Sequence, residues 1–523
     1  MDKNNYKILL IRPYFEMQRN ELGFLPFEPL GLQYLQAVLF AAGYQAEIYD
    51  CLIAKPYRVE FLKSKNLYHC GASITDVLKR IKKFQPDIVG LSGMFYSQKN
   101  SFYDLADAIK KHYPQIFILG GGAFPSSYQE EIFNENKSFD AIAVGEGEQT
   151  IVELLENFSQ PESVKGLWLK NKSDNSVFFT GVRPPLFQLD QLPLPARRYD
   201  RIYDYSKNVG FYYSDKFNFI NLAKQVIFYG GLSLPLIRGL LAKVMNYRND
   251  SKPKATLLPL GFIVTSRGCP QRCTFCAIHK VWGQNYRIRP AASVLSEINQ
   301  LASHGAKEIV IVDDNFTVSK KRTIEICQGI IAKNHNLRLM TPSGVYLTSL
   351  DEETLDYLYR AGLRELIFGI ENGDQKFLNT VIKKNLDLEQ AKSLIALAKK
   401  IGLKTKCFLI FGYPGETKDT MIKTLRFGFE SGVDSARFYI FQPFPNTEAY
   451  QMAKGMGALN PGFDLSHLKV RTDVPQINTP EFNSQEVKRI FDLANSLKSG
   501  QEYNKIKDDL WGALGWTKPL ESK

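Results

Sequence analysis

The stretch Cys269-Pro270-Gln271-Arg272-Cys273-Thr274-Phe275-Cys276 contains three of the seven cysteines of this 523-residue chain. It follows a short apolar run at 262–266 that predicts a β-strand, so the thiols are expected on a loop after that strand. Three thiolates at this spacing can bind three irons of a 4Fe-4S cluster and leave the fourth iron open. A zinc site usually takes four ligands in spaced pairs, whereas Cys327 and Cys407 stand alone in a predicted helix and a predicted strand. The motif therefore favours an iron–sulfur cluster with one open iron.

Short apolar runs alternate with amphipathic stretches after this loop, up to about residue 450. The predicted strands lie at 262–266, 308–312, 338–345, 365–369, 404–411 and 436–441. Six such units are typical of a partial, open (β/α)6 TIM-like barrel, whose site lies at the carboxyl ends of its strands. Candidate binding residues after those ends are Asp313, Asp314, Glu371, Gly412, Gly415 and Glu416. Each could also belong to a helix cap, but their order along one barrel favours a site.

The N-terminal part shows the same alternation from residue 7 to about residue 155. Its strands are predicted at 7–11, 45–49, 87–92, 116–120 and 141–144. This pattern predicts a doubly wound, Rossmann-like sheet, in which a ligand lies beyond the carboxyl ends of the strands. Glycines at those ends let the backbone approach a flat or phosphate-bearing cofactor. The expected contacts are Ser92, Gly93, Gly121, Gly122 and Gly145.

Four segments follow from these patterns. They are a Rossmann-like domain at 1–158, a linker at 159–254, the barrel at 255–460 and a small C-terminal appendage at 461–523. Within the linker, residues 217–247 are unusually apolar and carry basic but no acidic side chains. This run either contacts a membrane or a lipid-like substrate, or forms helices that pack on the main domains. Pro235 interrupts it too early for a membrane-spanning helix.

Composition and charge describe an ordinary folded protein. Hydrophobic residues make up 44% and charged residues 23%, and the net charge of +12 is spread over a long chain. No dense basic run with interleaved aromatic residues is present, so we expect no nucleic-acid partner. The apolar run at 8–11 is too short for a signal peptide. Scattered cysteines indicate a reducing compartment, and we expect a cytoplasmic protein.

The cysteine motif, with Phe275 before its last cysteine, resembles the signature of the radical S-adenosylmethionine (SAM) enzymes. This resemblance implies that Cys269, Cys273 and Cys276 hold a 4Fe-4S cluster whose open iron binds the methionyl part of SAM. Cleavage of SAM would then give a 5′-deoxyadenosyl radical. By the same resemblance Asp313 and Asp314 lie at the amino group of SAM, Glu371 lies at its ribose or amine, and Gly412, Gly415 and Glu416 lie at its adenine, with Phe275 also at the cofactor site.

The N-terminal segment resembles the cobalamin-binding domain that precedes the barrel in a large subgroup of these enzymes. The similar residues are Pro29–Leu35, Gly120–Ala123 and Gly145–Glu148. Many cobalamin proteins carry an Asp-x-His-x-x-Gly segment after the first strand, but residues 12–30 contain no histidine. The resemblance therefore implies either cobalamin without a lower histidine ligand, as in the methylating subgroup, or a relict domain that binds nothing. The glycines retained at the strand ends favour bound cobalamin.

These features together predict a cobalamin-dependent radical SAM enzyme. The leading hypothesis is a C-methyltransferase that acts on an unactivated carbon of a hydrophobic or natural-product substrate and takes electrons from a donor such as flavodoxin or ferredoxin. One alternative is an oxidative cyclase or rearrangement enzyme acting on a tetrapyrrole, lipid or natural product. A second alternative is a non-catalytic iron–sulfur electron carrier or sensor. His279, three residues beyond the last cysteine, is expected either at the cluster region or in a structural role.

Overall fold

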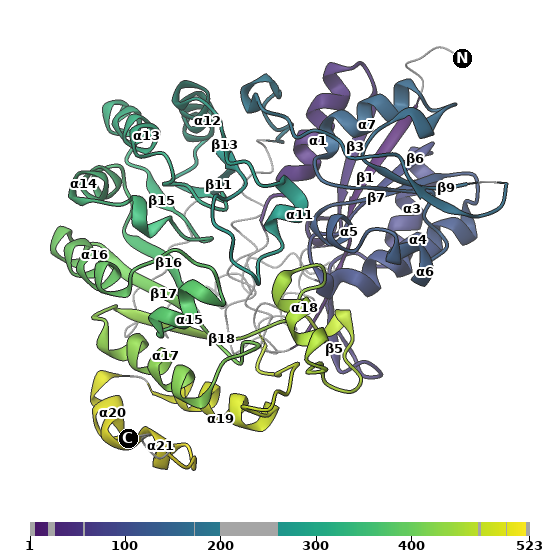
Figure 1. The fold of residues 1–523 in the computed structure, drawn as a ribbon. Helices are drawn as coiled ribbons and strands as arrows, with labels where there is room; N and C mark the ends of the chain where they lie inside the picture. Colours follow the sequence, from purple (N-terminus) through teal and green to yellow (C-terminus); the bar gives the residue numbers. More distant parts are fainter. Residues whose placement is uncertain are drawn as a thin grey trace, which may run out of the picture.

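The N-terminal domain is built on a seven-stranded sheet, seen at the right of Figure 1. The structure is a computed structural model that describes residues 6–18, 27–55, 58–171, 173–198, 260–468, 472–497 and 499–518. The sheet order is β10-β9-β8-β7-β6-β1-β3. The strands are β1 (Lys7–Arg12), β3 (Gln45–Asp50), β6 (Ile88–Ser92), β7 (Phe117–Gly121), β8 (Ala141–Ala143), β9 (Leu167–Lys170) and β10 (Val177–Phe179). The run from β8 to β3 is parallel, and these five strands match the predicted ones to within one residue at each end.

Helices cover both faces of this sheet, as predicted for a doubly wound domain. They are α1 (Leu30–Ala41), α2 (Cys51–Ala54), α3 (Ile74–Phe84), α4 (Lys99–His112), α5 (Ala123–Tyr128), α6 (Glu131–Glu135) and α7 (Gly147–Glu156). Alternate residues of β1 point to opposite faces. Ile8 and Leu10 pack in the core under α1 and α7, whereas Leu9 and Ile11 pack in the core under α3 and α4. The buried run of β1 is therefore apolar on both sides.

Two features of this domain differ from the sequence prediction. The segment expected to begin the linker at residue 159 adds β9 and β10 to the sheet in antiparallel orientation, so the sheet continues past residue 158. A second, three-stranded antiparallel sheet is formed by β2 (Phe15–Met17), β5 (Leu67–Cys70) and β4 (Val59–Leu62). Strands this short give little periodic signal. The apolar run at 217–247 lies outside the described residues.

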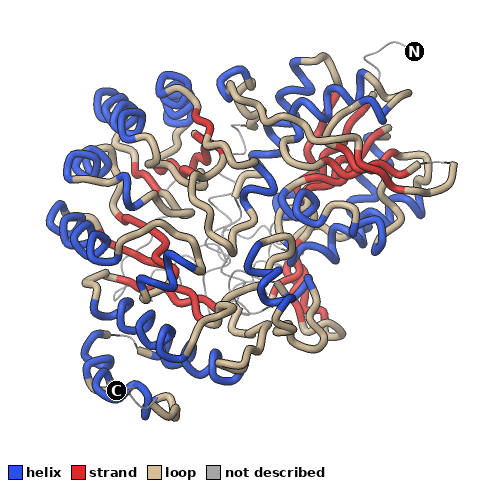
Figure 2. The backbone as a smooth tube through the Cα atoms, in the orientation of Figure 1, coloured by secondary structure: helices blue, strands red, loops and turns tan. Residues whose placement is uncertain are grey.

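The C-terminal half forms the predicted partial barrel from two three-stranded parallel sheets. One sheet contains β11 (Leu260–Ile263), β14 (Glu308–Ile311) and β15 (Arg338–Met340), and the other contains β16 (Glu365–Glu371), β17 (Lys404–Phe411) and β18 (Ser435–Ile440). A single parallel bridge between Leu339 and Leu363 joins them. The outer helices are α12 (Ala291–Ser303), α13 (Lys320–Lys333), α14 (Glu352–Arg360), α16 (Leu388–Ile401) and α17 (Lys418–Glu430). Figure 2 shows these helices outside the strands.

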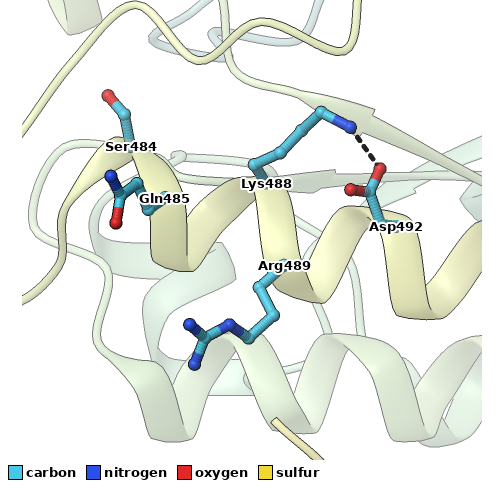
Figure 3. Close-up of a pocket in the computed structure, with 5 residues that line it drawn as sticks. All are labelled: Ser484, Gln485, Lys488, Arg489 and Asp492. Carbon is cyan, nitrogen blue, oxygen red and sulfur yellow. Dashed lines mark hydrogen bonds and ion pairs between the residues drawn. The ribbon is translucent and has the colours of Figure 1, made fainter. Parts of the chain in front are cut away.

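The remaining helices complete the barrel and its appendage. They are α11 (Ile278–Trp282), α15 (Gln375–Thr380), α18 (Glu448–Gly455), α19 (Ser484–Ser496), α20 (Gly500–Asn504) and α21 (Leu510–Ala513). Helix α19 packs Val487 and Ile490 into the barrel core beside β18. Its exposed side bears a shallow groove lined by Ser484, Gln485, Lys488, Arg489 and Asp492 (Figure 3). None of the helices within the described ranges combines the length and the hydrophobicity of a membrane span.

Candidate active site

The cysteine loop connects the two strands of a short hairpin, β12 (Ser266–Arg267) and β13 (Arg287–Ile288). Thr274 fixes this loop to the rest of the barrel. Its N–H donates to the Ile382 carbonyl at 3.0 Å, and its carbonyl accepts from the Ala449 N–H at 2.9 Å. The two ends of the loop come close together at Gly268, where a Cβ would lie 2.5 Å from the Asn285 carbonyl oxygen. The loop is therefore held to the rest of the barrel by backbone contacts at Thr274.

The three thiols are half-buried in this loop and lie near one another. Burial raises the pKa of Cys273 to about 11 and that of Cys276 to about 12, so both are protonated at neutral pH until a metal binds. The Asn315 side-chain amide lies 2.8 Å from the Cys269 sulfur. Within the described part of the chain, no three metal-binding side chains converge on one point as in a mononuclear site. In a cluster, each of the three thiols on this loop would bind a different iron.

Aromatic rings support the loop from the barrel side. The Phe275 ring packs edge-on against Tyr413, with 6.4 Å between ring centres. The Tyr413 hydroxyl hydrogen-bonds the Thr274 hydroxyl, and the Tyr413 ring also packs against Phe377 and Phe441. The observed contact of Phe275 is thus with another aromatic ring, and its contact with the cofactor stays a prediction.

The acidic pair after β14 has two different roles in the structure. Asp313 is 2% exposed and accepts hydrogen bonds from the Thr265 N–H and the Ser266 hydroxyl, each at 2.6 Å. Asp313 therefore ties the end of β11 to the end of β14. Asp314 faces the cysteine loop, where it accepts from the Gly268 N–H at 3.2 Å. Burial and the neighbouring Asp313 raise the pKa of Asp314 to about 7. Of the two, Asp314 is the better placed for the predicted contact with an amine.

Glu416 shapes the loop after β17. Its carboxylate accepts from the Asn372 amide at 2.7 Å, from the Gly412 N–H at 2.8 Å and from the Tyr413 N–H at 3.0 Å. The side chain is fully buried, and burial raises its pKa to about 8. Gly412 and Gly415 adopt positive φ values of 77° and 82°, which glycine tolerates best. Both Glu416 oxygens are thus used within the protein, and its contact with a cofactor stays a prediction.

Glu371 forms a buried ion pair that the sequence reading did not include. The Lys384 ammonium lies 2.8 Å from the Glu371 carboxylate. Burial alone would lower the pKa of Lys384, but the neighbouring Glu371 carboxylate raises it, so the ammonium stays charged beside the cysteines. A Cβ on Gly369 would lie 2.0 Å from the Glu371 carboxylate, so glycine at this position makes room for the pair. The sequence signal for the cation was only the Lys383-Lys384 doublet after α15.

His279 has a structural position in the cysteine loop. One ring nitrogen lies 2.6 Å from the Gln271 carbonyl oxygen and the other lies 3.2 Å from that of Gly283. These two carbonyls belong to opposite ends of the loop. The histidine therefore contacts both sides of the cysteine loop, which supports a structural role, while its contact with the cluster region stays a prediction.

The predicted cofactor residues of the N-terminal domain gather at one edge of its sheet, where β6, β7 and β8 end. A Cβ on Gly122 would lie 2.6 Å from the Gly93 carbonyl oxygen, so the backbones of these two loops are in close contact. Gly145 faces α11, because a Cβ there would lie 3.4 Å from the Val281 carbonyl oxygen. Helices α11 and α5 also pack together. Ser92 and Gly121 are paired in register at the ends of β6 and β7. The strand ends therefore lie beside the cysteine loop of the barrel.

Buried ion pairs join these two parts of the molecule. Arg267 and Arg287, which pair in register on β12 and β13, both bind the Glu146 carboxylate, at 2.7 and 2.8 Å. Arg267 also pairs with Glu148, and its guanidinium lies 5.0 Å from the centre of the Trp282 ring. All four charged side chains are less than a tenth exposed. The sequence indicated the Gly145–Glu148 segment as part of a cofactor site because of its glycines. In the structure, its two carboxylates make the contacts between the domains.

Comparisons with known proteins agree with this architecture. The family model for the Radical SAM superfamily matches residues 263–428, and that for the B12 binding domain matches residues 25–155. The cytidylyl-2-hydroxyethylphosphonate methyltransferase of Streptomyces wedmorensis is 27% identical over 533 residues, which cover 96% of this chain and 90% of that protein. The anaerobic magnesium-protoporphyrin IX monomethyl ester cyclase of Rubrivivax gelatinosus is 25% identical over 452 residues, covering 85% of this chain and 69% of that protein.

A solved structure shows the same fold. The cobalamin-dependent S-adenosylmethionine radical enzyme OxsB, determined with aqua-cobalamin and S-adenosylmethionine bound, superposes with a TM-score of 0.66 at 16% identity. The match covers 98% of this chain and 71% of that one. Both proteins therefore have a doubly wound, Rossmann-like sheet followed by a partial barrel.

Proposed function

The chain belongs to the radical SAM proteins that carry a B12-binding domain, and on this premise we propose that it methylates an unactivated carbon of a small molecule. One observation carries the proposal. The loop with Cys269, Cys273 and Cys276 lies against the glycine-bearing strand ends of the B12-binding domain, through α11 and Gly145. A radical generated at the loop and a methyl carrier at those strand ends would then act on one substrate between them.

The residues around the cysteines suit SAM. A cluster held by the three thiolates supplies the electron that breaks the sulfonium bond of SAM. The methionyl part of SAM carries both an amine and a carboxylate, and the site offers both counter-charges. Asp314 lies at the loop for the amine, and the Lys384 ammonium lies beside Cys273 for the carboxylate. Gly412 and Gly415 let the backbone after β17 approach the adenine.

The strand ends of the N-terminal domain suit cobalamin, which supplies a methyl carrier when bound. Ser92, Gly93, Gly121, Gly122 and Gly145 lie along one edge, with Ser92 able to hydrogen-bond the nucleotide tail. Residues 12–30 contain no histidine that could bind the lower face of the cobalt. The glycines kept at the strand ends favour bound cobalamin over a relict domain.

Three finer features complete the proposal. An electron donor such as flavodoxin or ferredoxin reduces the cluster, because each reductive cleavage of SAM consumes an electron. All seven cysteines are free thiols, which suits the reducing cytoplasm. From its composition alone, the apolar run at 217–247, which lies outside the described residues, would contact a hydrophobic substrate or a membrane surface, or form helices that pack on the main domains.

Anaerobic reconstitution tests the function directly. The full chain is loaded with iron, sulfide and hydroxocobalamin, then given dithionite and SAM. We expect about four irons per chain, one tightly bound cobalamin, and formation of both 5′-deoxyadenosine and S-adenosylhomocysteine. A protein that binds no iron, or that still cleaves SAM after all three cysteines are changed to alanine, would refute it.

A second candidate function is an oxidative cyclase, since the relative from Rubrivivax gelatinosus is named for ring formation. The two functions differ in their products. A cyclase forms 5′-deoxyadenosine without S-adenosylhomocysteine, whereas a methyltransferase forms both. An iron–sulfur carrier or sensor would form neither.

A further inference from the structure

The inner face of the second half-barrel carries one arginine in its middle. Ala436 and Phe438 of β18 point outwards, because both would lie within 3.1 Å of a Cβ added to Gly428 on α17. Successive side chains of a strand point to opposite faces. Arg437, between them, therefore points to the inner face, away from the outer helices that Figure 1 shows.

Arg437 has aromatic neighbours on this face. The strand register pairs Arg437 with Phe408 of β17, and Phe408 in turn with Gly369 of β16. The Tyr439 ring lies 5.6 Å from the Phe408 ring, edge to face. Phe408 and Tyr439 are half-buried and Arg437 is exposed, whereas the outward-facing residues of β17 and β18 are buried almost throughout. This inner face is therefore accessible at the level of Arg437.

Three other cations of the barrel strands and loops each have a carboxylate partner. Glu308 pairs with Arg338, Glu365 with Lys406 at 2.7 Å, and Glu371 with Lys384. Across the described residues, Arg437 forms neither an ion pair nor a side-chain hydrogen bond. Lys404 on β17 is likewise exposed, but it is the first residue of its strand and so stands at the opposite mouth of the barrel from the cysteines. Arg437 is thus the unmatched positive charge in the middle of the inner face.

We propose that Arg437 binds an anionic oxygen group of the substrate, a carboxylate, phosphate or phosphonate, while Phe408 and Tyr439 contact the apolar part beside it. This inference rests on the proposed function and names its substrate class. A guanidinium presents paired N–H donors that match the oxygens of such groups. An apolar wall with one fixed charge is the usual composition of a site that orients a small molecule.

The spacing of the strands shows how far Arg437 lies from β16, the strand whose Glu371 is paired with Lys384 beside the cysteines. Gly369 and Arg437 lie in the same row, two strand spacings apart, which is about 10 Å. Glu371, two residues further along β16, is paired with Lys384 beside Cys273. A substrate with its anionic group at Arg437 can therefore extend toward the cluster, and the carbon that reacts is at its far end from the anion.

Phosphate binding to the reconstituted full chain tests this anchor. Inorganic phosphate is titrated into the protein and followed by ³¹P NMR, in which the reduced, paramagnetic cluster broadens the signal of bound phosphate. The titration is done for the wild type, for Arg437→Gln and Arg437→Lys, and for the matched control Lys404→Gln. We expect saturable broadening in the wild type, binding at least about tenfold weaker in Arg437→Gln, an intermediate value in Arg437→Lys, and no change in Lys404→Gln. Equal cluster absorbance and melting temperature in all variants show that they are folded.

Three results would overturn the inference. These are no saturable broadening in the wild type, equal phosphate affinity in Arg437→Gln, and weaker SAM binding in Arg437→Gln, which would assign the arginine to SAM instead. The proposed function is tested separately, by measuring the 5′-deoxyadenosine that is formed. Lys404→Gln, outside the site, should form it from SAM at the wild-type rate, whereas a wild type that forms none would refute the function and leave the phosphate titration as an independent measurement.

Discussion

The guanidinium of Arg267 and the carboxylate of Glu146 meet across the two domains at 2.7 Å, with 4% and 9% of their side chains exposed. Arg267 lies two residues before Cys269, and Glu146 directly follows Gly145 at the edge of the B12-binding sheet. The pair therefore links the loop that would carry the cluster to the strand ends that would carry cobalamin. A buried pair of this kind costs desolvation, and its main effect is to fix one relative position of the groups that it joins.

Glu146→Gln should destabilise the protein strongly. Removing one partner leaves the guanidinium groups of Arg267 and Arg287 buried without their shared carboxylate, which typically costs about 3–5 kcal/mol. Urea unfolding, followed by fluorescence, measures the loss. Glu153→Gln is the control, because Glu153 also pairs with an arginine but is 43% exposed and should change stability by less than about 1 kcal/mol. Equal midpoints for the two variants would contradict this role.

The same pair predicts the acid sensitivity of the fold. Burial alone would raise the pKa of Glu146, but Arg267 and Arg287 outweigh it and lower the pKa below the usual 4.5. A carboxyl whose pKa is lower in the folded state stabilises the fold fully above pH 4.5, and this contribution is lost as the pH falls through the folded value. The stability difference between wild type and Glu146→Gln should therefore be largest at neutral pH and shrink below 4.5. Urea titrations at several pH values measure it, and a constant difference would argue against the ionised pair.

Cys273→Ser should abolish cluster binding, because serine keeps the size but not the thiolate that binds iron. After anaerobic reconstitution we expect loss of the visible absorbance of the cluster and of SAM cleavage. Cys327→Ser is the matched control, since Cys327 lies on the buried face of α13 in the barrel core, and it should retain iron. Iron retained in Cys273→Ser and lost in Cys327→Ser would overturn the assignment.

His279→Ala should loosen the cysteine loop without removing a ligand. A ring N–H donates to the Gln271 carbonyl, 2.6 Å away, and loss of this hydrogen bond costs about 1 kcal/mol. We expect the reconstituted cluster to be lost faster to a chelator, while His279→Gln, whose amide can also donate to a carbonyl, should be intermediate. Loss rates equal to the wild type in both variants would leave the histidine without this function.

The sequence predicted what depends on local pattern and missed what depends on partners distant in the chain. Short apolar runs separated by amphipathic stretches predicted the five parallel strands of the first sheet. The strand ends suggested Asp314 and Glu371 as site residues, and the structure places both of them near the cysteine loop. The Arg267 contact joins residues 121 positions apart, so no local pattern indicates it. Asp313 and Glu416 show the same limit. Their positions after strands predicted ligand contacts, whereas their oxygens accept hydrogen bonds from neighbouring loops, which only the folded chain brings together.

Gly369→Ala should weaken SAM binding through Glu371 and Lys384. The added Cβ would lie 2.0 Å from a Glu371 oxygen and 2.8 Å from the Lys384 nitrogen, so the pair has to move. Overpacking of this kind costs about 1–3 kcal/mol, which corresponds to roughly tenfold or more in SAM affinity if the displaced charges contact the methionyl group. Equilibrium binding of SAM to the reconstituted protein measures the effect. Gly455→Ala, at the end of α18 with open space around it, is the control and should bind SAM normally. If Gly369→Ala also binds SAM with the wild-type affinity, the Glu371–Lys384 pair does not contact SAM, and the assignment of Lys384 to its carboxylate fails.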